Sequence, residues 1–251
     1  PGLAIVDSMN VTIENSNFSE NSIGVRFGWA AVGYEANQST LKHSVVRNNI
    51  ASGIYAQYTN NITLYNNSII DHDGSNDEGI YLSTQCSYWN ISENNISNNE
   101  DGIHIYESSG ANAGYFNEIT ANNITGNTNG LSFEYYGYNN TINYNNFNSN
   151  NYALRFYQFS YDNLIEYNKF DGSTTYDFYF YSTSYLGQRM YSNTIDGDDY
   201  LHCYNNLSYS TNNSWSEQDR VSNFGAANIY RCDNIHLDNI TVTGHLLSGS
   251  D

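Results

Sequence analysis

The stretch "ISENNISNNEDGIHI" at residues 91–105 decides the fold. Its isoleucines stand alone among asparagines, and a glycine precedes the last apolar pair. The six-residue frame that opens it, apolar-x-x-Asn-x-apolar in most copies, recurs along the chain. The nine copies are "IENSNF" (13–18), "LKHSVV" (41–46), "LYNNSI" (64–69), "ISENNI" (91–96), "ITANNI" (119–124), "INYNNF" (142–147), "IEYNKF" (165–170), "MYSNTI" (190–195) and "IHLDNI" (235–240). Their fixed internal spacing indicates a structural repeat.

A second motif follows all but the last of these frames. It is a short run in which apolar and variable residues alternate, as in a strand buried on one face. The runs are "GVRF" (24–27), "GIYA" (53–56), "GIYL" (79–82), "GIHI" (102–105), "GLSF" (130–133), "ALRF" (153–156), "DFYF" (177–180) and "YLHC" (200–203). Successive frames begin 23 to 28 residues apart, except for a gap of 45 before the last, so the base period is near 23 residues.

Two or three short strands per period, with polar turns between them, predict an all-β fold: a parallel β-solenoid of about nine to ten coils. Equivalent residues of successive coils would stack about 4.8 Å apart, so that inward Ile and Phe form continuous ladders. The fourth frame position falls where the chain must bend. We expect the asparagines there to bond to turn amides and to one another. They are Asn67, Asn94, Asn122, Asn145, Asn168 and Asn193.

The composition agrees with a β fold and excludes several functions. The 25 Tyr and 11 Phe favour strands, and 16% aromatic residues exceeds what disordered chains carry. A net charge of −18 with eight Lys and Arg excludes a general nucleic-acid binder, because phosphates require clustered cations. No apolar run approaches the length of a membrane span, so no membrane insertion is expected in this segment.

The three cysteines do not form a disulfide framework or a zinc site, because their spacing matches neither. Cys203 ends the last run of the second motif, where it is expected to point inward. Cys232 lies three residues before the last six-residue frame. Cys86 falls in an inter-strand loop. Cys86 is therefore the candidate for a crosslink between molecules.

Asn-X-Ser/Thr sequons occur twelve times, a mild excess over chance. Nine of them are candidate glycosylation sites: Asn10, Asn17, Asn61, Asn90, Asn95, Asn123, Asn139, Asn206 and Asn239.

The repeats over residues 10–245 resemble the right-handed parallel β-helix repeat proteins of the NosD-like group. The most specific part is "NTIDGDDYLHCY" (193–204) followed, after a gap, by "NIYRCDNIHLDNITVTG" (228–244). This passage is similar to one in archaeal cell-surface members, but it differs in having Asp198 and Asp199 after Gly197. The resemblance implies a right-handed β-helix and an exported, extracellular protein of the cell envelope.

We interpret residues 1–251 as a single β-helix domain, a segment of a longer chain, with 204–227 as a long excursion loop or a degenerate coil. The chain opens at Pro1, and neither end carries an obvious cap. Because solenoids expose their core at uncapped ends, this predicts self-association into a larger assembly or further domains of the same chain.

The outward residues of the second strands form two adjacent columns. One contains Arg26, Tyr55, Tyr81, His104, Ser132, Arg155, Tyr179 and His202, and the other contains Gln57, Ser83, Tyr106, Glu134, Tyr157, Tyr181 and Tyr204. Aromatic rings with interspersed Arg and His on a flat sheet could stack on a saccharide chain. The alternative to glycan binding is that the stacked tyrosines are structural or pack against a neighbouring subunit.

The insertion "DHDGSND" with the following glutamate places four carboxylates within eight residues: Asp71, Asp73, Asp77 and Glu78. Such a cluster could hold Ca²⁺ through hard oxygen ligands, or it could be a solvated acidic turn. We expect no other cofactor, because the six histidines show no paired ligand spacing for copper.

No catalytic residue emerges from the sequence, because the lysines and carboxylates match no lyase or glycosidase arrangement. The favoured function is therefore structural: a glycosylated, non-enzymatic element of an archaeal cell-surface assembly such as a surface layer, sheath or filament. The alternative is a polysaccharide-binding or carbohydrate-active protein, that is, a lyase, epimerase or hydrolase.

Overall fold

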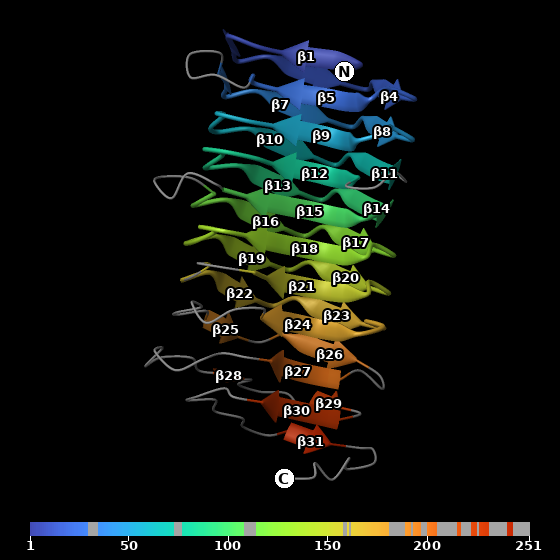
Figure 1. Cartoon of the computed structure of the whole chain (residues 1–251), viewed down its shortest axis with the longest axis vertical. Coiled ribbons are helices and arrows are strands. Elements are labelled where there is room, and N and C mark those ends of the chain that lie inside the picture. Colours follow the sequence, from blue (N-terminus) through green and yellow to red (C-terminus); the bar gives the residue numbers. More distant parts are fainter. Residues whose placement is uncertain are drawn as a thin grey trace.

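The computed structural model is an all-β solenoid whose strands stack one above another along a single axis (Figure 1). It describes residues 1–29, 35–72, 77–107, 114–157, 160, 162–180, 189–191, 193–196, 200–204, 215–216, 222–224, 226–230 and 240–242. Within these ranges side chains are described as far as Tyr179 and, beyond it, at Asn193.

Three long sheets carry most of the strands, and every pairing is parallel. Sheet 1 consists of β1 (Leu3–Ile5), β5 (Ile23–Phe27), β9 (Ser52–Ala56), β12 (Glu78–Leu82), β15 (Asp101–Tyr106), β18 (Asn129–Glu134), β21 (Tyr152–Phe156) and β24 (Tyr176–Phe180). Sheet 2 consists of β3 (Thr12–Glu14), β7 (Thr40–Lys42), β10 (Thr63–Tyr65), β13 (Asn90–Ser92), β16 (Glu118–Thr120), β19 (Thr141–Asn143), β22 (Leu164–Glu166), β25 (Arg189–Tyr191) and β28 (Trp215–Ser216).

Sheet 3 consists of β4 (Asn17–Ser19), β8 (Val45–Arg47), β11 (Ser68–His72), β14 (Asn95–Asn99), β17 (Asn123–Thr125), β20 (Asn146–Asn148), β23 (Lys169–Asp171) and β26 (Thr194–Asp196). Three two-stranded pairs complete the fold: β2 (Ser8–Met9) with β6 (Ala36–Asn37), β27 (Tyr200–Tyr204) with β30 (Ala226–Tyr230), and β29 (Ser222–Phe224) with β31 (Ile240–Val242).

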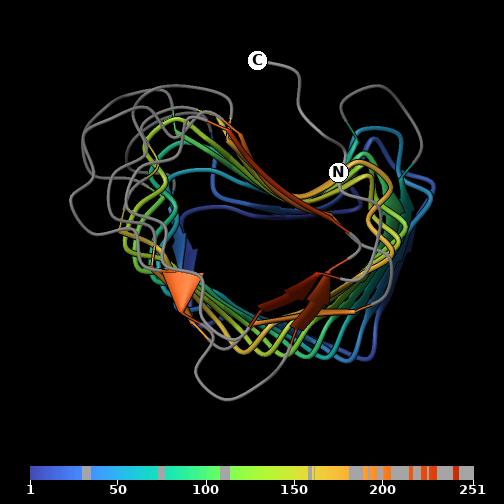
Figure 2. The same cartoon turned by 90° about the horizontal axis from the view of Figure 1, so that it is seen from below.

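One coil runs through sheet 2, then sheet 3, then sheet 1, as in β13, β14 and β15. Seen along the axis, successive coils superimpose around a common interior (Figure 2). The predicted solenoid is confirmed, and the second motif of each repeat forms a sheet 1 strand. The six-residue frame is not one strand, however. It spans a corner, with its first apolar residue in sheet 2 and its last in sheet 3.

The core consists of apolar ladders, as the repeat predicts. In sheet 2 each buried residue pairs in register with the next, as Leu64 does with Ile91. Aromatic residues continue the ladders toward the C-terminal side, and the rings of Phe147 and Phe170 stack at 5.1 Å. Each coil needs only a few apolar residues because the neighbouring coils cover them.

The predicted asparagine column forms a hydrogen-bonded ladder at the corner between sheets 2 and 3. Asn122 is typical: its amide accepts a bond from the backbone N–H of Asn94 (2.9 Å) and donates to the carbonyl of Ile91 (2.8 Å). The side chains also bond to one another, as Asn122 does to Asn145 (2.9 Å). The ladder thereby satisfies buried backbone groups that the sheets do not reach.

Within the described residues, the three long sheets show fewer coils than the nine to ten predicted. These sheets contain eight, nine and eight strands. Residues 204–227 contain β28 and β29, and the rest of that segment lies largely outside the described ranges. Within the described residues, no helix is long and apolar enough to cross a membrane.

Candidate functional site

The outer face of sheet 1 carries the candidate site. The strand register aligns the predicted outward column, since Tyr55 pairs with Tyr81, Tyr81 with His104 and His104 with Ser132. Arg155 and Tyr179 extend the same column on β21 and β24. Within the described residues the predicted column is thus aligned in register as a stripe, although Ser132 within it is buried. Tyr181 lies outside them, and the side chains of His202 and Tyr204 are not described.

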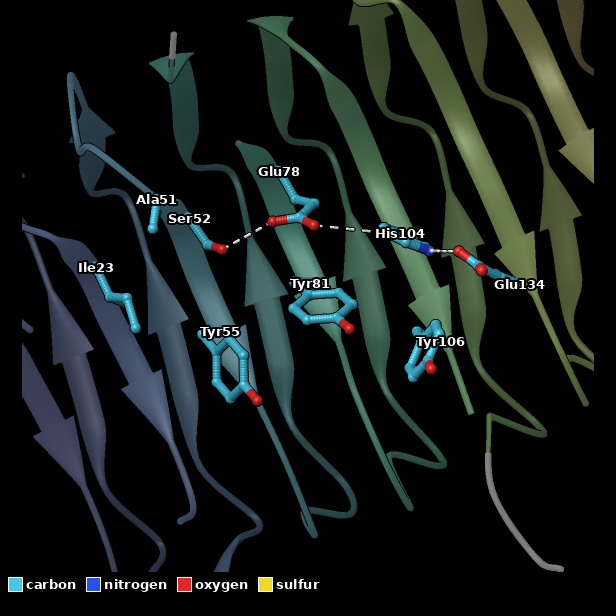
Figure 3. A pocket seen from close by; sticks show the side chains of 9 residues that line it. All are labelled: Ile23, Ala51, Ser52, Tyr55, Glu78, Tyr81, His104, Tyr106 and Glu134. Atoms are coloured by element: carbon cyan, nitrogen blue, oxygen red, sulfur yellow. Dashed lines mark hydrogen bonds and ion pairs between the residues drawn. The ribbon is translucent and has the colours of Figure 1, made fainter. Parts of the chain in front are cut away.

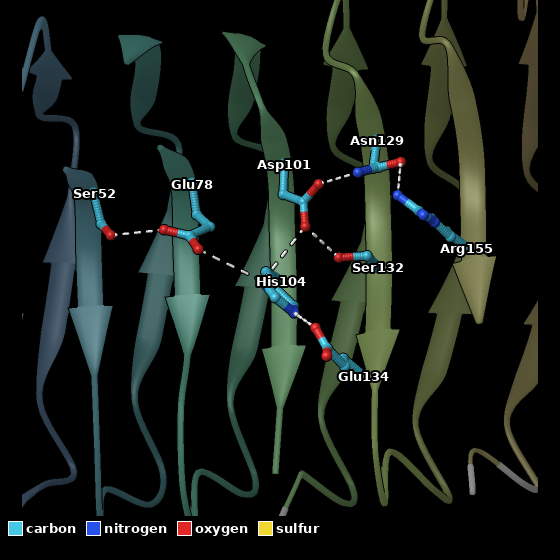
Figure 4. Close-up of polar contacts among 8 residues, drawn as sticks. All are labelled: Ser52, Glu78, Asp101, His104, Asn129, Ser132, Glu134 and Arg155. Atoms are coloured by element: carbon cyan, nitrogen blue, oxygen red, sulfur yellow. Dashed lines mark hydrogen bonds and ion pairs between the residues drawn. The ribbon is translucent and has the colours of Figure 1, made fainter. Parts of the chain in front are cut away.

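A further column on this face, which the sequence analysis missed, contains the residues at the start of each strand. Ser52, Glu78, Asp101 and Asn129 each precede a glycine and stack in neighbouring coils (Figure 4). In β12 the alternation breaks here, because Gly79 and Ile80 are both buried. Residues three apart, such as Glu78 and Tyr81, therefore face the same side.

In β12, β15 and β18 a glycine occupies the first of the two consecutive buried positions. A Cβ added at Gly102 would lie 2.6 Å from the carbonyl oxygen of Gly130 in the next coil. Glycine fits this close approach without a clash, although β21 has Ala153 and β24 has Asp177 at the equivalent position. The close approach brings the side chains of adjacent coils, including two acidic ones, into one cluster.

His104 lies at the centre of that cluster, surrounded by three carboxylates (Figure 4). Its Nδ1 is 3.4 Å from Oδ2 of Asp101 and 3.6 Å from Oε1 of Glu78. Its Nε2 is 3.3 Å from Oε2 of Glu134. The His104 side chain is 13% exposed, whereas that of Glu134 is 31% exposed. Glu134 is therefore the member of the cluster most accessible to a ligand.

Hydrogen bonds fix the two more deeply buried carboxylates. Glu78 accepts a bond from the hydroxyl of Ser52 (2.9 Å). Asp101 accepts bonds from the Asn129 amide and, at 2.5 Å, from the Ser132 hydroxyl. Burial raises the pKa of Asp101 above its ordinary value, although its contacts with His104, Ser132 and Asn129 oppose that shift.

The carboxylates keep His104 protonated at neutral pH. Burial alone would lower the pKa of His104, but the contacts with Glu134 and Glu78 and the charge of Asp101 raise it to about 9. An imidazolium held among carboxylates is a proton donor beside proton acceptors.

Tyrosines form the wall of a shallow pocket on one side of His104 (Figure 3). The pocket has a volume of about 480 Å³, and Tyr55, Tyr81 and Tyr106 line it. The rings of Tyr81 and His104 lie 5.1 Å apart. Burial and the charge of Glu78 raise the pKa of Tyr81, so its hydroxyl stays protonated and can donate a hydrogen bond.

A second, smaller pocket of about 160 Å³ lies on the other side of His104. Arg155 and Tyr157 line it, together with Asn129 and the carboxylates of the cluster. The Arg155 guanidinium lies 4.2 Å from the Tyr157 ring centroid and donates to Oδ1 of Asn129 (3.2 Å). Burial, with the charges of Asp101 and Glu134, raises the pKa of Tyr157 to about 12 despite the opposing charge of Arg155.

Among the described residues, the predicted calcium ligands Glu78 and Asp71 have different partners. Glu78 faces His104, whereas Asp71 accepts a hydrogen bond from Asn98 (2.9 Å). Asp77 is buried, and Asp73 lies outside the described residues. In the described part of the chain, no group of three or more His, Cys, Asp or Glu side chains could hold a metal ion. A calcium site involving Asp73 stays a prediction.

The prediction that Cys86 crosslinks molecules is wrong. Its loop turns inward, and the side chain is fully buried in the core beside the Thr59 hydroxyl (3.5 Å). Burial raises the pKa of the Cys86 thiol to about 12, so it is neither accessible nor ionised at neutral pH.

The candidate glycosylation sites differ in exposure. Five are exposed: Asn10, Asn17, Asn61, Asn95 and Asn123. Asn90 and Asn139 are half-buried, and Asn206 and Asn239 lie outside the described residues. Glycosylation itself stays a prediction.

Comparison with known proteins agrees with the fold. Residues 1–132 match the profile of a family described as the right handed beta helix region. A search of curated protein sequences found no match.

Among solved structures, the chain is similar to the A-module of the mannuronan C-5 epimerase AlgE4 from Azotobacter vinelandii, with 19% identity and a TM-score of 0.61 over 94% of this chain and 65% of that one. It is also similar to a mutant of the periplasmic alginate epimerase AlgG, with 14% identity and a TM-score of 0.62 over 88% of this chain and 55% of that one. The chain thus spans somewhat more than half the length of these structures, and at such identities the likeness shows the fold alone.

Proposed function

This chain belongs to the right-handed β-helix family, and we propose that it is a carbohydrate-active member. It binds a glycan along the outer face of sheet 1 and performs proton-transfer chemistry on the bound sugar at His104. The observation that carries the proposal is the nearly buried His104, whose ring nitrogens lie 3.3 to 3.6 Å from carboxylate oxygens of Glu78, Asp101 and Glu134.

A purely structural coil gains little from this cluster. Burying charged groups costs free energy unless their partners compensate for the lost hydration, and apolar replacements are often as stable. Titratable groups with shifted pKa values beside a cleft are instead typical of functional sites. The structural role favoured by the sequence suits the regular ladders, but it gives no reason for the cluster. That role, with its cell-surface location, stays a prediction.

The surroundings of His104 support a saccharide ligand. Tyr81 and Tyr106 offer ring faces and hydroxyls next to the acidic cluster, as a polar molecule with apolar C–H faces requires. In this arrangement Glu134 is the accessible carboxylate that accepts a proton. His104 is the donor, and Tyr81 contributes a hydroxyl that stays protonated. The similar structures named as epimerases of mannuronan and alginate support the same class of function by analogy of fold.

The test is a survey of polysaccharides that covers neutral, amino-sugar and uronic-acid polymers. Purified protein is incubated with each, and reducing ends, unsaturated products and sugar configuration are measured. We expect one polymer to be altered, with His104→Gln and Glu134→Gln each lowering the rate by about a hundredfold or more. Glu118→Gln, which removes an exposed carboxylate from sheet 2, is the matched control and should leave the rate unchanged.

Two results would overturn the proposal. One is the absence of any binding or change in all the polymers tested. The other is full activity in both His104→Gln and Glu134→Gln, which would show that the cluster takes no part in the reaction.

A further inference from the structure

The charges around His104 determine which glycans the groove can accept. We infer that the site selects a glycan without negative charge, either a neutral or an amino-sugar chain, and rejects polyuronates. This inference rests on the proposed function and specifies its substrate class.

Carboxylates outnumber cations around the smaller pocket. Its acidic lining residues are Glu78, Glu100, Asp101 and Glu134, and its cations are His104 and Arg155. The larger pocket shares Glu78, His104 and Glu134 with it. A ligand that reaches His104 from either side therefore meets more negative than positive charge.

The protein neutralises His104 with carboxylates, whereas Arg155 contacts neutral groups. His104 contacts carboxylates through both ring nitrogens. Arg155 donates to Asn129, and its guanidinium lies over the ring of Tyr157 and within 5.7 Å of the Tyr179 ring centroid. A carboxylate that pairs with Arg155 would lie in a pocket already lined by four other carboxylates.

No other described cation is placed to help. Lys42 pairs with Glu14 in sheet 2, and Lys169 pairs with Asp171 in sheet 3. Arg26 is on sheet 1, but it stacks over Trp29 and Tyr55 and does not line either pocket. Arg47 is exposed on sheet 3. The remaining three arginines, Arg189, Arg220 and Arg231, belong to the part of the chain whose side chains are not described.

The charge of the whole chain acts in the same direction. A net charge of −18 repels a polyanion at long range and attracts a polycation. At short range, sugar hydroxyls can donate to Glu134, and an amino-sugar ammonium can pair with it. A uronate placed there would bring like charges together in a partly desolvated site, which is strongly unfavourable.

The experiment compares oligosaccharides of equal length in three charge classes: neutral hexoses, hexosamines and hexuronates. Binding to the intact chain is measured on an array and then by calorimetry at low and high salt. We expect the binders to be neutral or amino sugars, with the matched hexuronates about tenfold weaker or more. Because salt screens repulsion between like charges, high salt should narrow that difference.

Charge variants give a second measurement that does not depend on catalysis. Glu134→Gln should reduce the difference in affinity between neutral and hexuronate ligands, whereas Glu118→Gln should leave that difference in affinity unchanged. Tightest binding of hexuronates that weakens with salt would overturn the inference while leaving the proposed function intact. The inference would also be overturned if Glu134→Gln left the difference in affinity between neutral and hexuronate ligands unchanged. Binding of no member of the three classes would overturn the proposed function itself.

Discussion

His104 links the stability of the protein to its candidate chemistry. Its pKa is raised to about 9 in the fold, above the value near 6.5 expected in the unfolded chain. A raised pKa means that the folded state binds the proton more tightly. The resulting stabilisation is therefore fully present below about pH 6.5 and is lost as the pH rises through about 9.

We predict that the free energy of unfolding falls by a few kcal/mol between pH 6.5 and pH 9.5, on the scale set by this pKa shift. In His104→Gln that slope should largely disappear, and the variant should be less stable at pH 6.5 by about 3 kcal/mol, since three carboxylates lose their cation. Urea unfolding at several pH values measures both effects. His43→Gln, at an exposed site on a corner, is the matched control and should keep the slope. A His104→Gln variant with the original slope would assign the pH dependence to other groups.

Sequence reasoning located His104 and Glu134 on the outer face but did not place Glu78 and Asp101 beside them. Strict alternation places His104 on the outer face, and the register agrees. The same alternation gives no reason to place Glu78 and Asp101 beside it, because it fails at the glycines. The signal was present in the pairs Ser-Gly, Glu-Gly, Asp-Gly and Asn-Gly at equivalent positions. Cys86 was misjudged for a related reason, since a loop position does not reveal whether the chain turns inward.

At the scale of the elements, the asparagine ladder sets the corner between sheets 2 and 3. Asn122 is buried, and its side chain bonds to the backbone of Asn94 and Ile91 and to the side chain of Asn145. The next residue, Asn123, is exposed, and its side chain bonds to the side chains of Asn95 and Asn146 in adjacent coils. These two residues are both asparagines and are adjacent in the sequence, so they differ mainly in how deeply their side chains are buried.

Asn122→Ala should therefore lower the free energy of unfolding by about 3 kcal/mol, because buried N–H and C=O groups lose their partners. Asn123→Ala should lower it by less than about 0.5 kcal/mol, since water replaces the lost contacts. Chemical denaturation of both variants measures the difference. If both substitutions lowered the free energy of unfolding equally, the asparagine ladder would not be a source of stability at this corner.

The repeat made this element predictable, because each ladder position recurs in the sequence with the same neighbours. The split of each frame into two strands was not predictable from alternation. The left-handed residue before each corner asparagine, such as Glu93 (φ 57°) or Tyr144 (φ 55°), ends one strand and begins the turn. These positions are occupied by residues of different types, so no single residue type marks the corner in the sequence.

At the scale of the whole molecule, parallel stacking makes the stripe run along the solenoid axis. From β5 to β24 sheet 1 takes six inter-strand steps, which corresponds to roughly 29 Å. The ring centroids of Tyr55 and Tyr81 lie 5.3 Å apart, and Tyr152 and Tyr179 continue the aromatic surface beyond Arg155. A glycan that follows the stripe can therefore contact several coils at once.

This orientation predicts how affinity depends on glycan length. Calorimetry with oligosaccharides of increasing length should give affinities that rise with each added sugar until the chain covers the stripe and then level off. Tyr179→Ala should make the affinity level off at a shorter length, because it removes one end of the surface. Tyr144→Ala is the matched control, because it removes a ring that is 60% exposed at the corner between sheets 2 and 3, away from the stripe. It should leave the dependence of affinity on glycan length unchanged. A glycan lying parallel to the strands, perpendicular to the solenoid axis, would contact only a coil or two around His104. Affinity would then stop rising after the first few sugars, and Tyr179→Ala would have no effect, which would exclude the axial orientation.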